Sequence, residues 1–320
     1  MGNLHIIMYH YTRDLKNSRY PNIKGLDYAM FHEQIMFLKR KFNIVTMEQV
    51  LEAVWSGGGY FPENAVLLTF DDGYIDHYTY ALPILEEAGV QGSFFIPGKT
   101  FSTHQLLDVN KIHYILASAD IQNLVLDVKE RLDFYRGTEY DYASNEELFD
   151  QYAVAGRFDD RETVFVKRIL QKALPEELRN RISSDLFEKY VGISEEKLAM
   201  ELYMNEDQIK TLKRHGMFIG VHGYDHYWLG DLPEAQMQSD ITKALEVMDE
   251  FIDSKCWVMN YPYGNYSKEV LDFIDRKSAK VGVTTKVSIA HLKKDNRLEL
   301  PRLNCNDFPP KSDNYRLCFS

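Results

Sequence analysis

The amino-acid sequence predicts an α/β protein whose mainly parallel sheet is covered by helices. Short apolar segments of strand length alternate with amphipathic segments of helix length over residues 4–103 and again over residues 200–305. Between them, residues 104–200 lose the apolar strand segments and are rich in Glu, Lys, Arg and Leu in a helical pattern. We therefore expect a single domain over residues 1–320 that carries a helical insertion at 104–200.

The first stretch of alternation begins with an apolar strand and continues with helices and strands in turn. Phe31, Ile35 and Leu38 recur at helical spacing, which predicts an amphipathic helix. Three glycines at 57–59 interrupt the chain, and Gly89 ends a later helix. Strands are expected at 4–9, 44–46, 65–70 and 93–97, and helices at 31–42, 47–55 and 78–88.

The alternation resumes after the insertion. Pro233 stands near the first turn of a long predicted helix, a position that tolerates its missing N–H group. Within the insertion, two segments have the pattern of surface helices, at 167–174 and 178–190. After it, strands are expected at 217–221, 257–260 and 280–284, and helices at 206–215, 233–252 and 268–277.

The composition argues against several classes of partner. Acidic residues number 48 against 37 basic ones, which gives a formal net charge of -11. This balance argues against a nucleic-acid partner, because phosphate backbones bind clustered Lys and Arg. No apolar segment reaches the roughly 18 residues of a membrane-spanning helix, so we expect no stable membrane insertion.

The cysteines and the N-terminus bear on the cellular compartment. Cys256, Cys305 and Cys318 are odd in number and match no CxxC pattern, which argues against a disulfide framework or a cysteine-rich zinc site. The N-terminal residues lack a basic head followed by a long apolar stretch, so no signal peptide is expected. As written, the chain is expected in the cytoplasm, and an extracellular location is the alternative if a leader has been removed.

A pair of carboxylates follows one of the most apolar predicted strands. Asp71 and Asp72 come directly after residues 65–70, and Gly73 allows a tight exit from the strand. Adjacent side chains point in different directions, so one carboxylate can bind a cation while the other faces a substrate. A solvated Asp-Asp-Gly turn is the common alternative. The fully apolar strand before it argues for a functional site.

Two histidines follow another predicted strand. His222 and His226 come after residues 217–221 and are four residues apart. On a helical turn this spacing puts both imidazoles on one face, close enough to share a metal ion. The segment is not the HExxH zinc-protease motif, because Gly223 stands where that motif has Glu. Two solvated loop histidines are the alternative interpretation.

A third segment, NYPYG at 260–264, also ends a predicted strand. Its Pro and Gly indicate a rigid loop whose backbone N–H groups can face an oxyanion, and an ordinary Pro-Gly turn is the alternative. Taken together, one Asp and two His make a three-ligand site with a position left open for water, which is typical of catalytic zinc centres. The spare Asp71 is placed to accept a proton from that water.

These motifs resemble those of the polysaccharide deacetylases, also called the NodB-homology group or carbohydrate esterase family 4. TFDDG at 69–73 resembles the first family motif, HGYDH at 222–226 the second and NYPYG at 260–264 the third. The resemblance covers roughly residues 4–103 and 200–305 and leaves the insertion unexplained. It implies a distorted (β/α) barrel with seven strands.

The resemblance also implies a role for each matched residue. Asp72, His222 and His226 resemble the metal ligands. Asp71 resembles the catalytic base, and Tyr263 the residue whose backbone N–H binds the oxyanion. Zinc is the expected metal, with cobalt, nickel or iron as alternatives. The implied reaction hydrolyses a linear amide C–N bond and removes an N-acetyl group from an amino sugar in a polysaccharide, oligosaccharide or glycan precursor.

Three features depart from the family pattern. Asn260 stands where the third motif often has an Arg that orients the catalytic Asp, and Arg302 is a candidate substitute from another strand. The family's general acid is a late histidine, for which His291 is our candidate and a solvated loop histidine is the alternative. His10, after the first predicted strand, is a second histidine that can line the pocket. Gly223 replaces the usual Ser or Thr without removing a ligand.

Two other functions remain open from the sequence. A metal-dependent amidase acting on a non-sugar amide would use the same centre in a narrow pocket instead of an open groove with aromatic platforms. A catalytically inactive carbohydrate-binding member is favoured by the missing Arg and opposed by the four intact central residues. The expected partner is an N-acetylated sugar or glycan, and the oligomeric state stays open.

Overall fold

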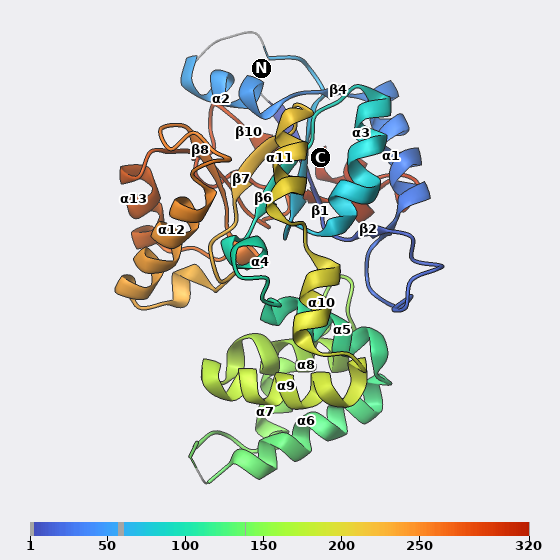
Figure 1. The fold of residues 1–320 in the computed structure, drawn as a ribbon, viewed down its shortest axis with the longest axis vertical. Coiled ribbons are helices and arrows are strands. Elements are labelled where there is room, and N and C mark those ends of the chain that lie inside the picture. Colours follow the sequence, from blue (N-terminus) through green and yellow to red (C-terminus); the bar gives the residue numbers. More distant parts are fainter. Residues whose placement is uncertain (1–2, 57–60, 138, 320) are drawn as a thin grey trace. The chain divides into compact units, whose positions relative to one another are not determined.

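The structure is a computed structural model that describes residues 3–56, 61–137 and 139–319 (Figure 1). The glycine break expected at 57–59 lies outside the described residues. The chain divides into two compact units, which we call the barrel unit and the helical unit. The barrel unit comprises Met1–Asp14, Gly25–Gln105 and Met200–Ser320, and the helical unit comprises Leu15–Lys24 and Leu106–Ala199.

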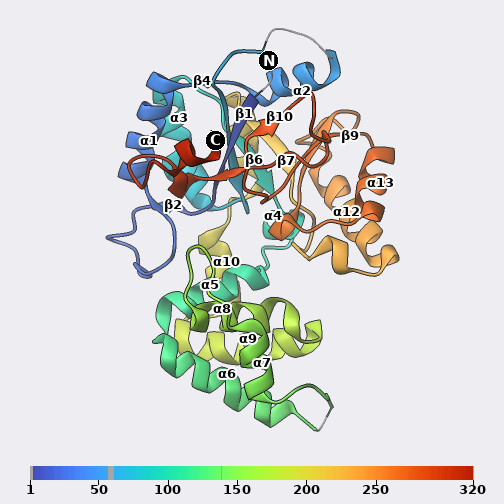
Figure 2. The ribbon, with the colours of Figure 1, turned by 180° about the vertical axis from the view of Figure 1, so that it is seen from behind.

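The barrel unit is built on a curled sheet of parallel strands (Figures 1 and 2). Each neighbouring pair along this path is parallel. Their carboxyl ends therefore meet at one edge of the sheet, where functional groups of α/β barrels collect. In spatial order the strands are β1 (Asn3–Tyr9), β5 (Ala65–Asp71), β6 (Ser93–Ile96), β7 (Phe218–Val221), β8 (Trp257–Asn260) and β9 (Ala279–Val283).

A late segment links the two ends of this path. Strand β11 (Leu303–Asn304) pairs in parallel with β1, and Leu300 forms a parallel bridge to Val283 of β9. The segment from Leu300 to Asn304 therefore adds a seventh parallel strand between the first and the last. This confirms the predicted distorted seven-stranded (β/α) barrel.

Four short strands lie outside the barrel path. Strand β4 (Asn43–Ile44) is parallel to β5, and β10 (Ala290–His291) is antiparallel to β1. Strands β2 (Thr12–Arg13) and β3 (Leu26–Asp27) form a small separate sheet.

Helices cover the outside of the barrel sheet (Figure 2). The predicted helical face of Phe31, Ile35 and Leu38 is buried and packs with Val66 and Leu68 of β5 in one core cluster. The alternate residues of β5 face the other way. The helices are α1 (Tyr28–Lys41), α2 (Met47–Ser56), α3 (Leu82–Ala88), α4 (Gly98–Ser102), α11 (Glu206–Arg214), α12 (Glu234–Met248) and α13 (Lys268–Arg276).

The alternation along β5 decides where Asp71 points. All seven residues of this strand are buried, as expected of a strand covered on both faces. Ala65 and Leu67 belong to a second core cluster, distinct from the one under α1 and α3. Because side chains alternate with a period of two, Thr69 and Asp71 share their face. Asp71 therefore stands at the carboxyl end of β5 on the side away from α1.

The predicted elements differ from the structure mainly at their ends. The helix expected at 78–88 begins with a π-helical turn at His77–Ala81, next to Pro83, which has no N–H group to donate. The strand expected at 44–46 pairs only over Asn43–Ile44. The long helix expected at 233–252 ends at Met248.

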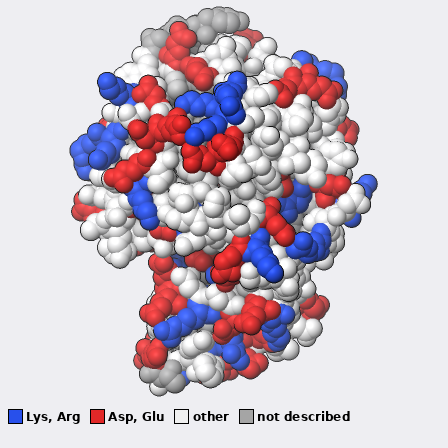
Figure 3. All heavy atoms as spheres, in the orientation of Figure 1, with Lys and Arg blue, Asp and Glu red and all other residues white. Residues whose placement is uncertain are grey.

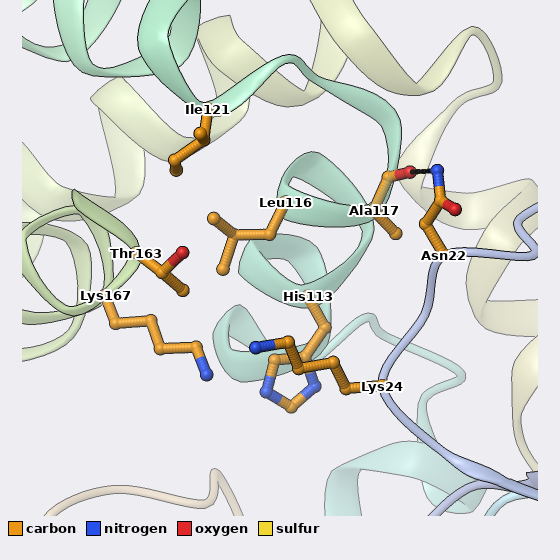
Figure 4. Close-up of a pocket in the computed structure, with 8 residues that line it drawn as sticks. All are labelled: Asn22, Lys24, His113, Leu116, Ala117, Ile121, Thr163 and Lys167. Atoms are coloured by element: carbon orange, nitrogen blue, oxygen red, sulfur yellow. Dashed lines mark hydrogen bonds between the residues drawn. The ribbon is translucent and has the colours of Figure 1, made fainter. Parts of the chain in front are cut away.

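The helical unit takes in residues 106–199, where the insertion was predicted at 104–200, and also residues 15–24, which no sequence pattern indicated. It contains a pocket of about 110 Å³ with an apolar wall that includes Leu116 and Ile121 (Figure 4). Lys24 and Lys167 stand at this pocket, and each ammonium group contacts one carboxylate oxygen of Asp159. Its helices are α5 (Asp108–Ser118), α6 (Ile121–Tyr135), α7 (Asn145–Tyr152), α8 (Arg161–Arg168) and α9 (Glu176–Val191), and α10 (Glu195–Leu202) leads back to the barrel unit.

The surface and the thiols fit the composition. On the face shown in Figure 3, acidic and basic side chains are interspersed among uncharged ones. Within the described part of the chain, no helix combines the length and apolarity needed to cross a membrane. Cys256 and Cys305 are free thiols.

Candidate metal centre and active site

Asp72 and the two motif histidines converge in the structure. The Oδ1 atom of Asp72 lies 3.4 Å from Nε2 of His222 and 3.3 Å from Nε2 of His226. All three candidate ligand atoms lie within 4.8 Å of one another, and all three residues are buried. Ligands at about 2.1 Å around a tetrahedral ion are separated by roughly 3.4 Å. The spacing therefore fits a single divalent cation.

The hydrogen bonding of His222 and Asp72 leaves one inner atom of each available to a cation. Nδ1 of His222 lies 2.7 Å from the carbonyl oxygen of Asn260, so this nitrogen carries the proton and Nε2 presents a lone pair. Oδ1 of Asp72 is buried and makes no hydrogen bond. A carboxylate oxygen that faces an imidazole lone pair is unfavourable unless a cation lies between them. The donor set thus fits a metal of the zinc type.

The protonation states favour the same conclusion. Burial alone would raise the pKa of Asp72, but positive charge on the imidazole side, from protons on His222 and His226, outweighs it and holds this pKa well below its usual range. Burial lowers the pKa of His226. Near neutral pH the carboxylate of Asp72 is therefore ionised and the imidazole of His226 is neutral. These are the protonation states that bind metal.

The loop that carries both histidines is irregular and not the helical turn expected from their spacing. Gly223 has φ 68° and His226 has φ 61°, both in the left-handed region. Asp240 of α12 accepts hydrogen bonds from the backbone N–H groups of Tyr224 and Asp225, at 3.0 Å and 2.8 Å. The imidazoles still meet, with ring centroids 4.8 Å apart. No signal in the sequence pointed to Asp240.

The same loop explains one departure from the family pattern. A Cβ atom added to Gly223 would lie 3.1 Å from Oδ1 of Asp240, and the positive φ is strained for any other residue. Glycine therefore suits this position better than the Ser or Thr that the resemblance led us to expect there.

Asp71 has a different partner from Asp72. Its two oxygens each accept a hydrogen bond of 2.8 Å from the guanidinium of Arg302, in a bidentate pair. Burial would raise the pKa of Asp71, but Arg302 and, to a smaller extent, His10 outweigh it and lower this pKa to about 2. The carboxylate of Asp71 is therefore ionised at any working pH.

Arg302 stands in the segment that closes the barrel, which is why it reaches Asp71. Its side chain is fully buried and also donates to the carbonyl oxygen of Thr284 and to Oγ1 of Thr69. Its second terminal nitrogen donates to Oδ1 of Asn260 at 2.9 Å. Arg302 thus provides the guanidinium that Asn260 lacks, as the sequence comparison with the family motif suggested.

Two further candidates lie beside these groups. Nε2 of His10 is 3.8 Å from Oδ2 of Asp71, and this side chain is 37% exposed. The ring of Tyr263 lies edge-on to His226, with centroids 4.7 Å apart, and stacks on Trp228 at 4.5 Å. The structure therefore brings Tyr263 to the candidate metal-binding triad and His10 to Asp71.

Backbone strain gathers at the same place. The described residues other than glycine with positive φ include Asp72 at 75°, His226 at 61° and Tyr263 at 57°. Such conformations are unfavourable for residues with a Cβ atom and cluster at functional sites. Three of the six positions of this kind therefore belong to the candidate site.

His291 does not join the other candidates. It pairs with Asn3 at the amino end of β1, and its Nδ1 lies 2.8 Å from Oδ1 of Asn3. His10 and Asp71 stand at the carboxyl end of the barrel strands, about 20 Å away along a seven-residue strand. The chain after β9 returns to the opposite end of the barrel and takes His291 away from Asp71. The prediction that His291 is the general acid is therefore wrong.

Comparison with known proteins identifies the family. The model of the family described as Polysaccharide deacetylase matches residues 58–125 and 186–282, together just over half of the chain. The chain belongs to the polysaccharide deacetylase family. The two matched segments include Asp71, Asp72, His222 and the other motif residues, and they leave out most of the helical unit.

Individual relatives agree with this assignment. YxkH of Bacillus subtilis (strain 168), named as a putative polysaccharide deacetylase, is 30% identical over 88 residues, which are 28% of this chain and 32% of YxkH. The match thus spans about a third of that relative. The Streptococcus pyogenes deacetylase PplD, solved in complex with acetate, has a TM-score of 0.60 at 17% identity and covers all of both chains. IcaB from Ammonifex degensii has a TM-score of 0.56 at 16% identity, over 95% of this chain and 92% of that one. At these identities the solved structures support the fold.

Proposed function

We propose that this member of the family is a metal-dependent N-deacetylase that hydrolyses the acetamido group of an amino sugar in a polysaccharide, oligosaccharide or glycan precursor. The observation that carries the proposal is the pairing of two different carboxylates at one strand end. Asp72 faces two imidazoles at metal-ligand spacing, while Asp71 is held by Arg302. A cation site beside a fixed, ionised base is the arrangement that amide hydrolysis by water needs.

The residues proposed to hold the ion are Asp72, His222 and His226. When bound, a divalent ion of the zinc type supplies Lewis-acid chemistry, since it lowers the pKa of water and polarises a carbonyl group. The carbonyl of Asn260 fixes the tautomer of His222 that this role requires.

Asp71 is proposed to accept the proton of the attacking water. Arg302 occupies one lone pair on each of its oxygens and fixes the plane of the carboxylate. Each oxygen keeps a lone pair that can accept a proton, and Oδ2 lies 3.8 Å from Nε2 of His10. The pair thus gives the base a defined direction, which matters because proton transfer requires hydrogen-bond contact.

His10 is the proposed proton donor to the leaving amine. It lies next to the base and is partly exposed, so a substrate can reach it. Asp71 is anionic and can accept a proton, whereas a protonated imidazole can donate one, so the two groups suit opposite roles. Water adds to the acetyl carbon, the C–N bond breaks, and acetate and a free amine leave.

Tyr263 is proposed to provide a backbone N–H group for the oxyanion that forms during attack. The support is its place in the third family motif, its contact with His226 and its fixed left-handed conformation. Its side chain and that of Trp228 form a stacked aromatic pair beside the site, which suits a sugar ring. The zinc assignment, the sugar substrate and the cytoplasmic location stay predictions.

The test is acetate release from N-acetylated glucosamine oligosaccharides by the purified chain, together with elemental analysis for metal. We expect one divalent ion per chain and acetate release that stops on chelation and returns with zinc or cobalt. A chain that binds the ion and hydrolyses only small non-sugar amides would support the amidase instead. If the chain binds oligosaccharide but releases no acetate with zinc, cobalt, nickel or iron, it is the inactive carbohydrate-binding protein.

A further inference from the structure

The second oxygen of Asp72 has a partner that no motif of the sequence indicated. The hydroxyl group of Tyr74 donates to Oδ2 of Asp72 at 2.6 Å, and both side chains are buried. A distance this short is typical of a hydroxyl that donates to an ionised carboxylate. We propose that Tyr74 is a positioning residue that fixes the carboxylate of Asp72 so that Oδ1 alone is offered to the cation.

The two oxygens of Asp72 are unequal in the structure. Oδ2 is occupied by the phenol, while Oδ1 has no hydrogen bond and faces the imidazoles of His222 and His226. A carboxylate without this phenol is free to rotate and present both oxygens to a cation. Tyr74 therefore selects one-oxygen ligation, which keeps the ligand count low and leaves room for water.

Tyr74 is rigid enough for this role. Its ring is fully buried and stacks on Tyr11, with centroids 4.2 Å apart and planes at 15°. On another side lies Tyr203, with centroids 6.2 Å apart, and the two residues also form an antiparallel backbone bridge. The carbonyl of Gly73 accepts a hydrogen bond from the N–H group of Met204 at 3.0 Å. The turn after β5 is therefore anchored independently of any metal.

The role also answers a problem posed by the backbone. Asp72 has φ 75°, an unfavourable conformation for an aspartate, and it stands outside the regular strand. Its side chain makes one hydrogen bond through Oδ2, to Tyr74, and none through Oδ1. Tyr74 thus sets the direction of a ligand that the strand does not hold.

This inference rests on the proposed metal centre, and Tyr74→Phe tests it by removing one oxygen atom. We expect the dissociation constant for zinc, measured by competition with a chromophoric chelator, to rise about 10–100-fold, as when outer-shell partners of metal ligands are removed. In the cobalt-loaded protein, we expect weaker visible absorption bands than in the wild type, because a second carboxylate oxygen raises the coordination number.

Tyr9→Phe is the matched control. Tyr9 is also a buried, stacked tyrosine at the end of a barrel strand, and its hydroxyl donates to Oε1 of Gln34 at 2.8 Å, away from the triad. Tyr9→Phe loses the buried hydrogen bond to Gln34, and Tyr74→Phe loses those to Asp72 and Tyr11, so both melting temperatures should fall, that of Tyr74→Phe at least as far. Zinc affinity and the cobalt spectrum should stay within about twofold of wild type in Tyr9→Phe, since no outer-shell contact is lost.

Equal zinc affinity and equal cobalt spectra in Tyr74→Phe and wild type would overturn the inference. If Tyr74→Phe does not fold, Tyr203→Leu is the alternative, because it removes one packing partner of the Tyr74 ring and keeps the Tyr74 hydroxyl. Zinc affinity is then expected to fall measurably, by less than about tenfold. An unchanged affinity in that variant would count against the role. Failure of the proposed function looks different, because the wild type itself would then bind no ion with its triad.

Discussion

Two neighbouring carboxylates of the same turn obtain their countercharge in opposite ways. Asp71 and Asp72 are both 2% exposed, and burial opposes ionisation of each. Asp71 has a fixed cation from within the chain, because Arg302 contacts both its oxygens. Asp72 faces two imidazoles and a phenol and has no basic side chain of Lys or Arg among its described contacts.

The difference indicates which carboxylate needs an external ion. A buried charge must be paired or coordinate a metal. Asp71 is already paired with Arg302, which agrees with its proposed role as a base of fixed direction. Asp72 has no such partner, and under the proposed function a bound metal ion provides its countercharge. The following variants distinguish the pairing of Asp71 with Arg302 from the proposed metal ligation by Asp72.

The largest effect expected comes from exchanging the two carboxylates for amides one at a time. Asp71→Asn should lower kcat by about 10²–10⁴-fold, because it removes a general base, while the metal content stays at that of the wild type. Asp72→Asn should lose the metal together with the activity. Elemental analysis and acetate release on both variants give the comparison, and loss of metal from Asp71→Asn would break it.

Removing the internal cation should destabilise the fold. Arg302→Met leaves Asp71 buried and unpaired, so we expect the free energy of unfolding to fall by about 3–5 kcal/mol. Urea titration measures this change. The double variant with Asp71→Asn should recover much of the loss, because the unpaired charge is gone. Additive losses in the double variant would show that the pair is not coupled.

The proton donor proposed beside Asp71 should affect rate and not metal binding. His10→Gln is expected to lower kcat about 100-fold, the lower end of the range for a general acid. His291→Gln is the control, since it lies at the amino end of the strands, and its kcat should match that of the wild type. A lower kcat in His291→Gln together with an unchanged kcat in His10→Gln would instead assign the general acid to His291.

Removing the metal should destabilise only a chain with an intact Asp72. With zinc at about 100 times its dissociation constant, binding adds about 2.7 kcal/mol to the free energy of unfolding. Adding a chelator during thermal unfolding should therefore lower the melting temperature of the wild type and leave that of Asp72→Asn unchanged. Equal shifts in both proteins would place the ion elsewhere.

The smallest effect concerns acid pH. Folding lowers the pKa of Asp71 from 3.8 to about 2, so the ionised form is stabilised by the native state. This gives ~2 kcal/mol that is present above pH ~4 and is lost as pH falls towards 2. In metal-free protein, the stability gap between wild type and Asp71→Asn should narrow over that interval. A constant gap would mean that Arg302 does not lower this pKa.

The fold and most of the candidate site could be predicted because their signals are local. Apolar segments define the strands, and a motif such as TFDDG stands directly at a strand end. Arg302 could only be suggested, because its contact with Asp71 depends on a segment 231 positions away that closes the barrel. His291 was wrong for the same reason, since its position depends on how the chain returns after β9.

Other features depend on backbone geometry that spacing alone does not reveal. The two motif histidines were expected on a helical turn, but Gly223 and His226 have left-handed conformations, and Asp240 holds the loop between them. Tyr74 was missed because nothing in the sequence distinguishes it from a tyrosine that only packs in the core. Its distance to Oδ2 of Asp72 shows its role.

The most direct test of the account is a crystal structure of the zinc-loaded protein with anomalous diffraction at the zinc edge. We expect one peak, about 2.0–2.2 Å from Oδ1 of Asp72 and from Nε2 of His222 and His226, with Asp71 still paired to Arg302. A zinc-saturated crystal with no peak at these three atoms, or with Asp71 released from Arg302 to bind the ion, would contradict it.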